Sequence, residues 1–384
     1  MTAPRVLVVN AGSSSLKYRV VDPSVPGRGR SALQRSVLQH SGLIERIGEP
    51  GSEVPDHQAA LATALADVDL DGVVAVGHRV VHGGEFDSAV LIDAEVERRI
   101  DELSALAPLH NPPALAGIRA ARAALPELPQ VAVFDTAFHA TMPREASTYA
   151  IDAALAAEHG IRRYGFHGTS YRYVSARAAE FLGRPLTELR LIVLHLGNGA
   201  SAAAILNGRS IDTSMGLTPL EGLVMGTRSG DIDPGVLFHL HAVTGADFDE
   251  LDDLLNRRSG LLGLAGRSDM REVQAAADAG SDAAALALDV YLHRLRRYIG
   301  AYLAELGGLD ALVFTAGVGE NSAIIRARAV ERLAHLGLAV DPALNAAAGG
   351  DARVISPPGA TPVLVVPTDE ESQIAMETIE LVAG

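Results

Sequence analysis

Residues 10–17, with the sequence NAGSSSLK, combine an amide, a glycine, three hydroxyls and an ammonium in one short segment. Lys17 is the only lysine, and every other member of the chain's 32 lysine and arginine residues is arginine. Phosphate suits such a turn, because a small residue lets backbone N–H groups approach, hydroxyls donate hydrogen bonds and an ammonium neutralises charge. An ordinary hairpin turn rich in Gly and Ser has the same composition. The single lysine favours the phosphate-binding interpretation.

Further charged side chains stand in polar or glycine-rich segments elsewhere in the chain. They are the cations Arg79, His167 and Arg228 and the carboxylates Asp135 and Glu370. Cations for oxyanions, together with carboxylates for Mg²⁺, are the groups that phosphoryl transfer needs. Each has a plainer alternative, because a single arginine is most often a surface ion pair and an aspartate after a strand is as often a turn or cap residue.

Two known nucleotide-binding patterns are excluded or incomplete. Leu16 precedes the lysine where a P-loop requires glycine, and the protein-kinase signatures are absent. Gly317 and Gly319 resemble the start of a dinucleotide fingerprint, but no third glycine completes it. The sequence therefore indicates phosphate chemistry without a P-loop.

Apolar runs of strand length come before these polar segments, and helical patterns separate most of them. Parallel strands of an α/β sheet present their ligand-binding groups at their carboxyl ends, so we expect an α/β fold with the site along those ends. The predicted strands are 6–9, 72–77, 130–134, 191–194, 312–314 and 362–366.

Local signals place several other elements. Residues 23–57 predict strands and loops, with an edge strand at 42–48. Asn111 is predicted as the N-cap of a helix, with Pro112 at its first position, and Thr169 or Ser170 as the cap of another. Residues 6–21 and 191–206 share one pattern of strand, polar turn and returning strand. Two domains of the same type, each with a phosphate-facing hairpin, follow from this repeat.

The composition narrows the class of protein. A formal net charge of −15 argues against nucleic acid and anionic membranes as partners. The absence of cysteine excludes disulfides, thiolate metal sites and cysteine nucleophiles. There is no signal-peptide pattern, and no run approaches the ~20 apolar residues of a membrane span. We expect a soluble, cytoplasmic protein whose 384 residues form two domains.

Nine motifs follow one another over nearly the whole chain. They are NAGSSSLKY (10–18), GHRVVHGG (77–84), PLHNPP (108–113), FDTAFH (134–139), YGFHGTS (164–170), HLGNGAS (195–201), MGTRSGDIDP (225–234), FTAGVGENS (314–322) and PTDEE (367–371). In these motifs and their order, the chain resembles the acetokinase family, in the fold group of sugar kinases, Hsp70 and actin. The family's usual Asn before the paired glutamates is Asp369 here, which adds a negative charge beside the metal, and the region before residue 58 is slightly short.

The resemblance implies a fold, an assembly and an activity. It implies two RNase H-like domains with an active-site cleft between them, the first at 1–139 plus 372–384 and the second at 140–371. It also implies a homodimer that phosphorylates acetate to acetyl phosphate, with ATP/ADP as co-substrate and Mg²⁺, or Mn²⁺ in its place, as cofactor.

The resemblance also implies roles for individual residues. The implied metal shell is Asn10, Asp135 and Glu370; the phosphate turn is Ser13, Ser15 and Lys17; and the substrate carboxylate is bound by Arg79. His167 and Arg228 are implied to steady the transferring phosphoryl group, with Asp135 and Arg79 also catalytic. The implied acyl pocket is Val81, Leu109, Phe166 and Pro219, and the implied nucleotide site is His195, Leu196, Gly197, Asn198, Gly199, Asp269, Met270, Arg271, Gly317, Val318, Gly319, Glu320 and Asn321.

Three other functions are compatible with these motifs to different degrees. A propionate or butyrate kinase of the same family differs by one or two methylenes, each worth only ~1–3 kcal/mol in an apolar pocket. A nucleotide-driven switch of the Hsp70 or actin kind needs neither Arg79 with Arg228 nor an apolar pocket beside them. An ATP hydrolase would release phosphate without an acyl acceptor.

Overall fold

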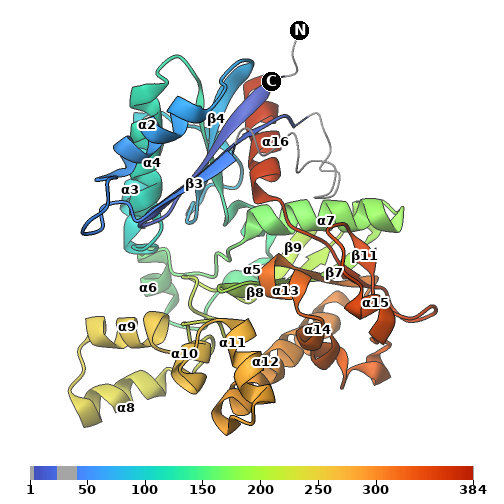
Figure 1. Cartoon of the computed structure of the whole chain (residues 1–384). Coiled ribbons are helices and arrows are strands. Elements are labelled where there is room, and N and C mark those ends of the chain that lie inside the picture. The colour runs from blue at the N-terminus through green and yellow to red at the C-terminus, as the bar shows by residue number, and fades with distance from the viewer. Residues whose placement is uncertain (1–3, 24–40, 384) are drawn as a thin grey trace. The chain divides into compact units, whose positions relative to one another are not determined.

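The computed structural model describes residues 4–23 and 41–383, and the chain divides into two compact units. The first unit comprises Met1–Ala140, Phe166–Tyr173 and Asp369–Gly384, and the second comprises Thr141–Gly165 and Val174–Thr368. The segment 166–173 thus clusters with the first unit. The domain boundaries expected from the family resemblance stay a prediction. Figure 1 shows the elements of each unit along the chain.

Each unit is built around one mixed sheet, and the two sheets have the same topology. Their strand orders are β3-β2-β1-β4-β6-β5 and β9-β8-β7-β10-β12-β11. In each, three antiparallel strands are followed by two parallel ones and a short antiparallel edge. The strands are β1 (Arg5–Ala11), β2 (Ser15–Val21), β3 (Ser41–Glu45), β4 (Val73–Val80), β5 (Val90–Leu91) and β6 (Gln130–Phe134), then β7 (Arg190–Leu196), β8 (Ala200–Leu206), β9 (Arg209–Thr213), β10 (Ala311–Thr315), β11 (Arg353–Val354) and β12 (Val363–Val365).

Helices cover both faces of the first sheet. Leu7 and Val9 of β1 face one apolar cluster and Val6 and Val8 face another, which explains why the run 6–9 is apolar at every position. The first cluster lies under α2 and α4, and the second lies under α16. The helices of this unit are α2 (His57–Asp67), α3 (Ala94–Glu102), α4 (Asn111–Ala124) and α16 (Glu370–Ala383), and α7 (Gly168–Leu182) begins in it.

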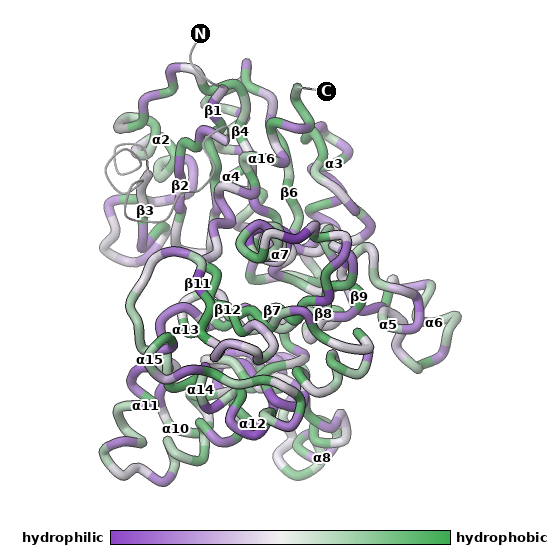
Figure 2. The backbone as a smooth tube through the Cα atoms, turned by 90° about the vertical axis from the view of Figure 1, so that its right-hand side faces the viewer, coloured by the Kyte–Doolittle hydropathy of each residue, from purple (hydrophilic) through white to green (hydrophobic). Residues whose placement is uncertain are grey.

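In the second unit the long helix α12 packs against β7 and β8. Figure 2 shows hydrophobic residues along β7, whose residues 191–196 are buried. None of the helices in the described ranges is long and apolar enough to cross a membrane. The helices of this unit are α5 (Arg144–Ser147), α6 (Ala153–Glu158), α8 (Gly235–Thr244), α9 (Phe248–Arg257), α10 (Gly260–Ala265), α11 (Met270–Asp278), α12 (Asp282–Leu306), α13 (Ala316–Asn321), α14 (Ala323–Val330) and α15 (Pro342–Ala346).

Most of the predicted elements are confirmed, including the repeated hairpins and the edge strand β3. The predictions for residues 24–40 lie outside the described residues. The N-cap prediction for Asn111 is wrong: His110 is the cap residue, and the buried Asn111 side chain instead hydrogen-bonds the backbone of His82. The alternative caps predicted for another helix, Thr169 and Ser170, are also wrong, since α7 begins at Gly168 and both residues lie inside it.

Candidate active site

The turn between β1 and β2 is held by hydrogen bonds to its own backbone and to α2. Gly12 N donates to Ser15 O at 2.7 Å, and the His57 ring Nε2 donates to Gly12 O at 2.8 Å. Asn10 and Lys17 are directly opposed in the antiparallel ladder. The predicted phosphate turn therefore presents Asn10, Lys17 and the serines 13 and 15 together, where β1 ends and β2 begins.

Three consecutive acids at the start of α16 each pair with a different cation. Lys17 contacts Glu371, Arg19 Nη1 lies 2.9 Å from Asp369 Oδ1, and Arg79 Nε lies 3.6 Å from Glu370 Oε2. Asp369 also accepts hydrogen bonds from Ser372 N and Oγ. The extra negative charge of Asp369, expected beside a metal, is thus paired with Arg19.

Asp135 follows the buried strand β6, and Arg79 and Thr169 donate hydrogen bonds to its carboxylate. Arg79 Nε and Nη2 donate to Asp135 Oδ1 and Oδ2 at 3.1 and 2.7 Å. The Thr169 hydroxyl donates to Oδ1 at 2.6 Å. Only 1% of the Asp135 side chain is exposed, so these charge-assisted bonds offset the cost of burying it. The plainer reading of Arg79 as a surface ion pair does not apply, since the Arg79 side chain is 19% exposed.

The neighbouring charges shift the protonation of this cluster. Burial opposes the charged form of Arg79, but attraction by Asp135 and Glu370 outweighs it and raises the pKa of the guanidinium. Burial also raises the pKa of Glu370, against the attraction of Arg79 and with added repulsion from Asp135 and Glu371. Carboxylates therefore outweigh cations here, and a further positive charge would stabilise the ionised cluster.

The side chains assigned to a metal fit a hard divalent cation. Asp135 and Glu370 supply carboxylate oxygens and Asn10 supplies an amide oxygen, the donors that Mg²⁺ prefers. Within residues 4–23 and 41–383, no group of three or more His, Asp or Glu side chains is placed to hold a metal. Mg²⁺ commonly keeps several waters and uses one or two carboxylates plus phosphates, so the donor set suits a nucleotide-bound cation.

His167 stands in a strained turn that joins the same cluster. Its φ of 59° lies in the left-handed region, which costs a non-glycine residue roughly 1–3 kcal/mol. The preceding carbonyl, Phe166 O, accepts a hydrogen bond from the buried His139 ring at 3.0 Å, and the following Gly168 N donates to Asp135 O at 2.8 Å. Bonds on both sides of His167 thus offset the strain.

The residues assigned to an apolar pocket are divided between the units. Phe166 is buried, with its ring edge-on to His82, while Val81 is half-buried and Leu109 is 39% exposed. Pro219 belongs to the second unit. The pocket formed by all four residues therefore stays a prediction.

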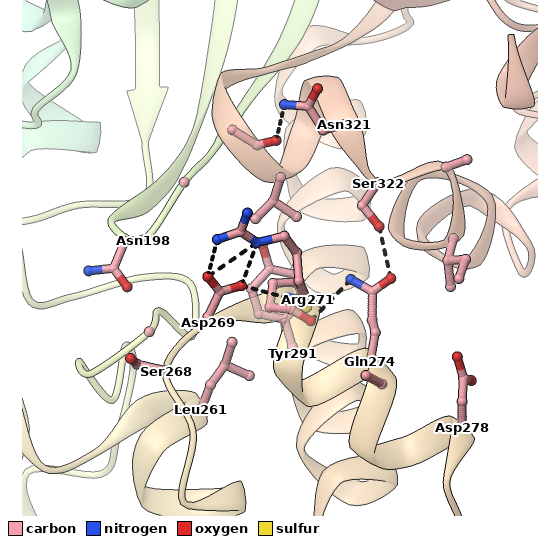
Figure 3. A pocket seen from close by; sticks show the side chains of 18 residues that line it. Asn198, Leu261, Ser268, Asp269, Arg271, Gln274, Asp278, Tyr291, Asn321 and Ser322 are labelled. Atoms are coloured by element: carbon pink, nitrogen blue, oxygen red, sulfur yellow. Dashed lines mark hydrogen bonds and ion pairs between the residues drawn. The ribbon is translucent and has the colours of Figure 1, made fainter. Parts of the chain in front are cut away.

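The second unit contains a cavity of about 940 Å³, which is drawn in Figure 3. Asp269 caps α11 and pairs with Arg271, whose hydrogen bonds lower the pKa of Asp269 to about 2. The lining also contains Leu261, Gln274 and Tyr291, which sequence reasoning missed. Eight of the predicted nucleotide-site residues line the cavity: Gly197, Asn198, Asp269, Met270, Arg271, Gly317, Val318 and Asn321.

The remaining predicted nucleotide residues lie beside the cavity without lining it. His195 and Leu196 are buried at the end of β7, and Gly199 O accepts from Gly197 N at 3.0 Å within the turn. Gly319 is buried in α13, and the Glu320 carboxylate accepts from Thr368 N. These residues shape the backbone that carries the lining side chains.

Arg228 is a half-buried cation of the second unit. Its Nη1 donates to Pro219 O at 3.0 Å, and burial lowers its pKa. None of the ion pairs found in the described part of the chain involves Arg228. Its remaining donors suit an anionic ligand.

Comparison with known proteins decides the family. A sequence profile of the Acetokinase family matches residues 5–376. The chain belongs to the acetokinase family. It is 58% identical to the acetate kinase of Leifsonia xyli, with 99% of each chain covered, and 54% identical to that of Streptomyces coelicolor, with 100% and 98% covered.

Two solved kinase structures match nearly the whole chain. The crystal structure of Porphyromonas gingivalis acetate kinase has a TM-score of 0.91 at 43% identity and covers 99% of this chain and 100% of its own. A propionate kinase from Francisella tularensis has a TM-score of 0.88 at 42% identity, covering 97% and 98%. The predicted α/β fold class of this family is therefore confirmed.

Proposed function

We propose that this chain is an acetate kinase, which transfers the γ-phosphoryl group of ATP to a carboxylate oxygen of acetate and also runs in reverse. The observation that carries the proposal is the Arg79–Asp135–Glu370 cluster, in a chain of the acetokinase family. Relatives named acetate kinase, at 54% to 58% identity over nearly the full length, favour acetate as the acid.

The mechanism needs positioning and charge compensation more than proton transfer. Acetate is ionised at neutral pH, so its oxygen attacks without a general base. Two unit charges about 4 Å apart still repel by ~4 kcal/mol at an effective dielectric of about 20, and this repulsion must be offset. Arg79 binds the acetate carboxylate in our proposal, since its hydrogen bonds to Asp135 use two of the five N–H donors of the guanidinium.

Arg228 and His167 contact the transferring phosphoryl group in this proposal. Charge in the transition state spreads over its equatorial oxygens, where fixed cations and N–H donors stabilise it. Arg228 has donors without an acidic partner among the described ion pairs, and His167 is held in a single strained conformation before the N-terminus of α7. Both features suit an anion.

Asn10, Asp135 and Glu370 hold Mg²⁺ in this proposal, directly or through water, with Mn²⁺ as a substitute. When bound, the cation offsets the charge of the nucleotide phosphates. Lys17, Ser13 and Ser15 contact those phosphates. Because Lys17 pairs with Glu371, the ammonium exchanges or shares this partner when a phosphate arrives.

The nucleoside occupies the cavity of the second unit in this proposal. A volume of about 940 Å³ is within the usual range for a site of this kind. Three segments contact the nucleotide: the end of β7 with the turn that follows it, the start of α11, and α13, which directly follows β10. Their residues are His195, Leu196, Gly197, Asn198 and Gly199, then Asp269, Met270 and Arg271, then Gly317, Val318, Gly319, Glu320 and Asn321.

The acyl group is the least constrained part of the proposal. Val81, Leu109, Phe166 and Pro219 form its pocket, and propionate differs from acetate by one methylene, worth ~1–3 kcal/mol. The similarity to a propionate kinase structure keeps propionate as the second candidate.

One assay tests the function directly. The protein is incubated with Mg-ATP and acetate, propionate or butyrate, and acyl phosphate is trapped with hydroxylamine. We expect the most hydroxamate from acetate; none from any acid would disprove the kinase proposal. Arg79→Ala should mainly raise the acetate KM. The control is Arg119→Ala, which removes an ion pair with Glu97 at a position where the arginine is 55% exposed, and it should leave the acetate KM unchanged.

Transfer is direct and in line in this proposal, without a phosphoenzyme. The acetate oxygen attacks the γ-phosphorus itself while the bond to the β-phosphate oxygen breaks and ADP leaves, so no side chain carries the phosphoryl group between the two substrates. A chirally labelled γ-phosphate should therefore show inversion of configuration, while retention would rule out a single transfer.

We also propose a homodimer, supported by an exposed apolar surface on α8 and α9. Phe238 and Val243 of α8 are 73% and 61% exposed, and Phe248 of α9 is 88% exposed. Such a surface on an acidic chain suits a second copy of the same patch. Light scattering should give twice the monomer mass, and Phe248→Asp should reduce it; a monomeric parent protein would refute the dimer. The cytoplasmic location stays a prediction.

A further inference from the structure

The sequence His167-Gly168-Thr169 contacts Asp135 at two separate points, one through the backbone and one through a side chain. Gly168 N donates to Asp135 O at 2.8 Å, and Thr169 Oγ1 donates to Asp135 Oδ1 at 2.6 Å. Both Thr169 and Asp135 are buried, at 2% and 1% exposure. The start of α7 is thus bonded to the residue that follows β6.

Gly168 shows how close this approach is. A Cβ at position 168 would lie 2.1 Å from Asp135 O, so no other residue fits without moving the backbone. His167, the residue before it, adopts a left-handed φ of 59°. The turn therefore has little freedom as long as its contacts with Asp135 persist.

The Thr169 hydroxyl restrains the Asp135 carboxylate in a direction that Arg79 alone does not. Arg79 binds both carboxylate oxygens from β4, and a guanidinium and a carboxylate can tilt together as a pair. Thr169 binds only Oδ1, from a different element, and so fixes the carboxylate against that motion. The same side chain lies two residues after His167, so it ties that turn to the carboxylate.

We propose that Thr169 is a positioning residue, whose hydroxyl holds the Asp135 carboxylate and the His167 turn in one fixed geometry. This inference rests on the proposed function, in which Asp135 serves the metal and His167 the phosphoryl group. Loss of the hydroxyl should lower kcat more than it raises either KM, because both groups are misplaced during transfer rather than during binding.

The test compares variants that keep or remove the hydroxyl. Thr169→Val should lower kcat 10- to 100-fold, the usual range for residues that orient a metal-site ligand. Thr169→Ser should stay within threefold of the parent. Thr378→Val is the matched control: Thr378 is also completely buried in the first unit, but its hydroxyl bonds only to Ile374 O of its own helix.

A second readout does not depend on activity. Hydrogen exchange of peptides that cover residues 166–170 should be faster in Thr169→Val, and unchanged in Thr169→Ser and Thr378→Val. Thr169→Ala removes the hydroxyl without a new methyl and replaces Thr169→Val if that variant does not fold.

The outcomes separate this proposal from the proposed function. If Thr169→Val keeps kcat within threefold, or if Thr169→Ser or Thr378→Val loses as much activity, the positioning role is wrong. Unchanged exchange at residues 166–170 in Thr169→Val also overturns it. If the parent protein makes no acyl phosphate, the proposed function fails, and the exchange measurement alone decides whether Thr169 holds the turn.

Discussion

The two hairpins β1–β2 and β7–β8 have the same place in sheets of the same topology, yet their chemistry differs. In the first, the ladder closes at Ala11 and Leu16, and Asn10 opposes Lys17. In the second, it closes at Leu196 and Ala200, and His195 opposes Ser201. The first turn thus has four residues between its last paired positions, and the second has three.

The surroundings of the hairpins differ in the same direction. Ion pairs that involve β2, β4 and α16 lie near the first hairpin. The second hairpin borders a cavity lined largely by glycine, apolar and amide groups. One scaffold therefore carries a cluster of ion pairs in the first unit and a cavity in the second, to which we assign charge compensation and nucleoside binding in our proposal. Four variants test this division of labour.

Asp135→Asn should have the largest effect on activity, because it removes the carboxylate to which both Arg79 and Thr169 bind. We expect a fall in kcat of about 10³-fold, comparable to the loss of a major electrostatic group in other active sites. Nucleotide binding in the second unit should persist, as measured by calorimetric titration with ADP. A parallel loss of ADP affinity would contradict the division between the units.

Lowering the pH should destabilise the first sheet through protonation of His78. This side chain is 2% exposed and is hydrogen-bonded to Gln130. Burial lowers its pKa from 6.5 to about 4, despite the Gln130 bond. The unfolded chain takes up the proton first, so stability is complete above pH 6.5 and is lost as the pH falls toward 4. From pH 7 to pH 5 the loss is about 2 kcal/mol.

The measurement compares the two sheets. Hydrogen exchange in peptides of β4 should accelerate from pH 7 to pH 5, after correction for intrinsic rates, more than in peptides of β10. His78→Gln keeps a donor for Gln130 and should remove most of this difference. Equal acid sensitivity of the parent and His78→Gln would show that other groups dominate.

Gly317→Leu should weaken nucleotide binding and leave acetate binding unchanged. A Cβ at position 317 meets no atom within 4 Å, and the residue lines the cavity, so the larger side chain projects into space that the nucleoside needs. We expect the ATP KM to rise about tenfold, close to 1.4 kcal/mol, with the acetate KM and the melting temperature unchanged. Gly317→Ala is the control and should be close to the parent protein.

Lys17→Arg should have the smallest effect of the four. The charge is kept, but a planar guanidinium does not replace a compact ammonium in a tight turn, so we expect about a fivefold fall in kcat/KM for ATP. Steady-state kinetics at saturating acetate measures it. A variant indistinguishable from the parent would mean that only the charge at position 17 matters.

The sequence predicted the fold well because its signals were local. Continuous apolar runs such as 6–9 and 191–194 identify strands buried on both faces, and the paired hairpins follow from their turns. Arg79 and Asp135 could each be singled out because they stand at predicted strand ends, but their pairing depends on β4 and β6 being neighbours in the sheet, which the order of strands along the chain does not reveal.

Other parts of the site depend on contacts that spacing does not reveal. Thr169 resembles a helix cap in the sequence, and only the close approach of Gly168 brings it to Asp135. The pairs of Asp369 with Arg19 and of Glu371 with Lys17 join residues about 350 positions apart. Tyr291 and Leu261 look like ordinary helix core, yet both border the cavity.

The single lysine has a chemical consequence. An acyl phosphate, the proposed product, acylates amines, and lysine is the side chain that accepts such a group whereas the guanidinium of arginine stays charged. Lys17 is 55% exposed and is the one side-chain amine in the sequence. If the chain makes this product, acylation of a side-chain amine would therefore fall on position 17, where an amide would remove the charge that pairs with Glu371. Since all the other residues among the 32 lysines and arginines are arginine, the chain offers such a product no second side-chain amine.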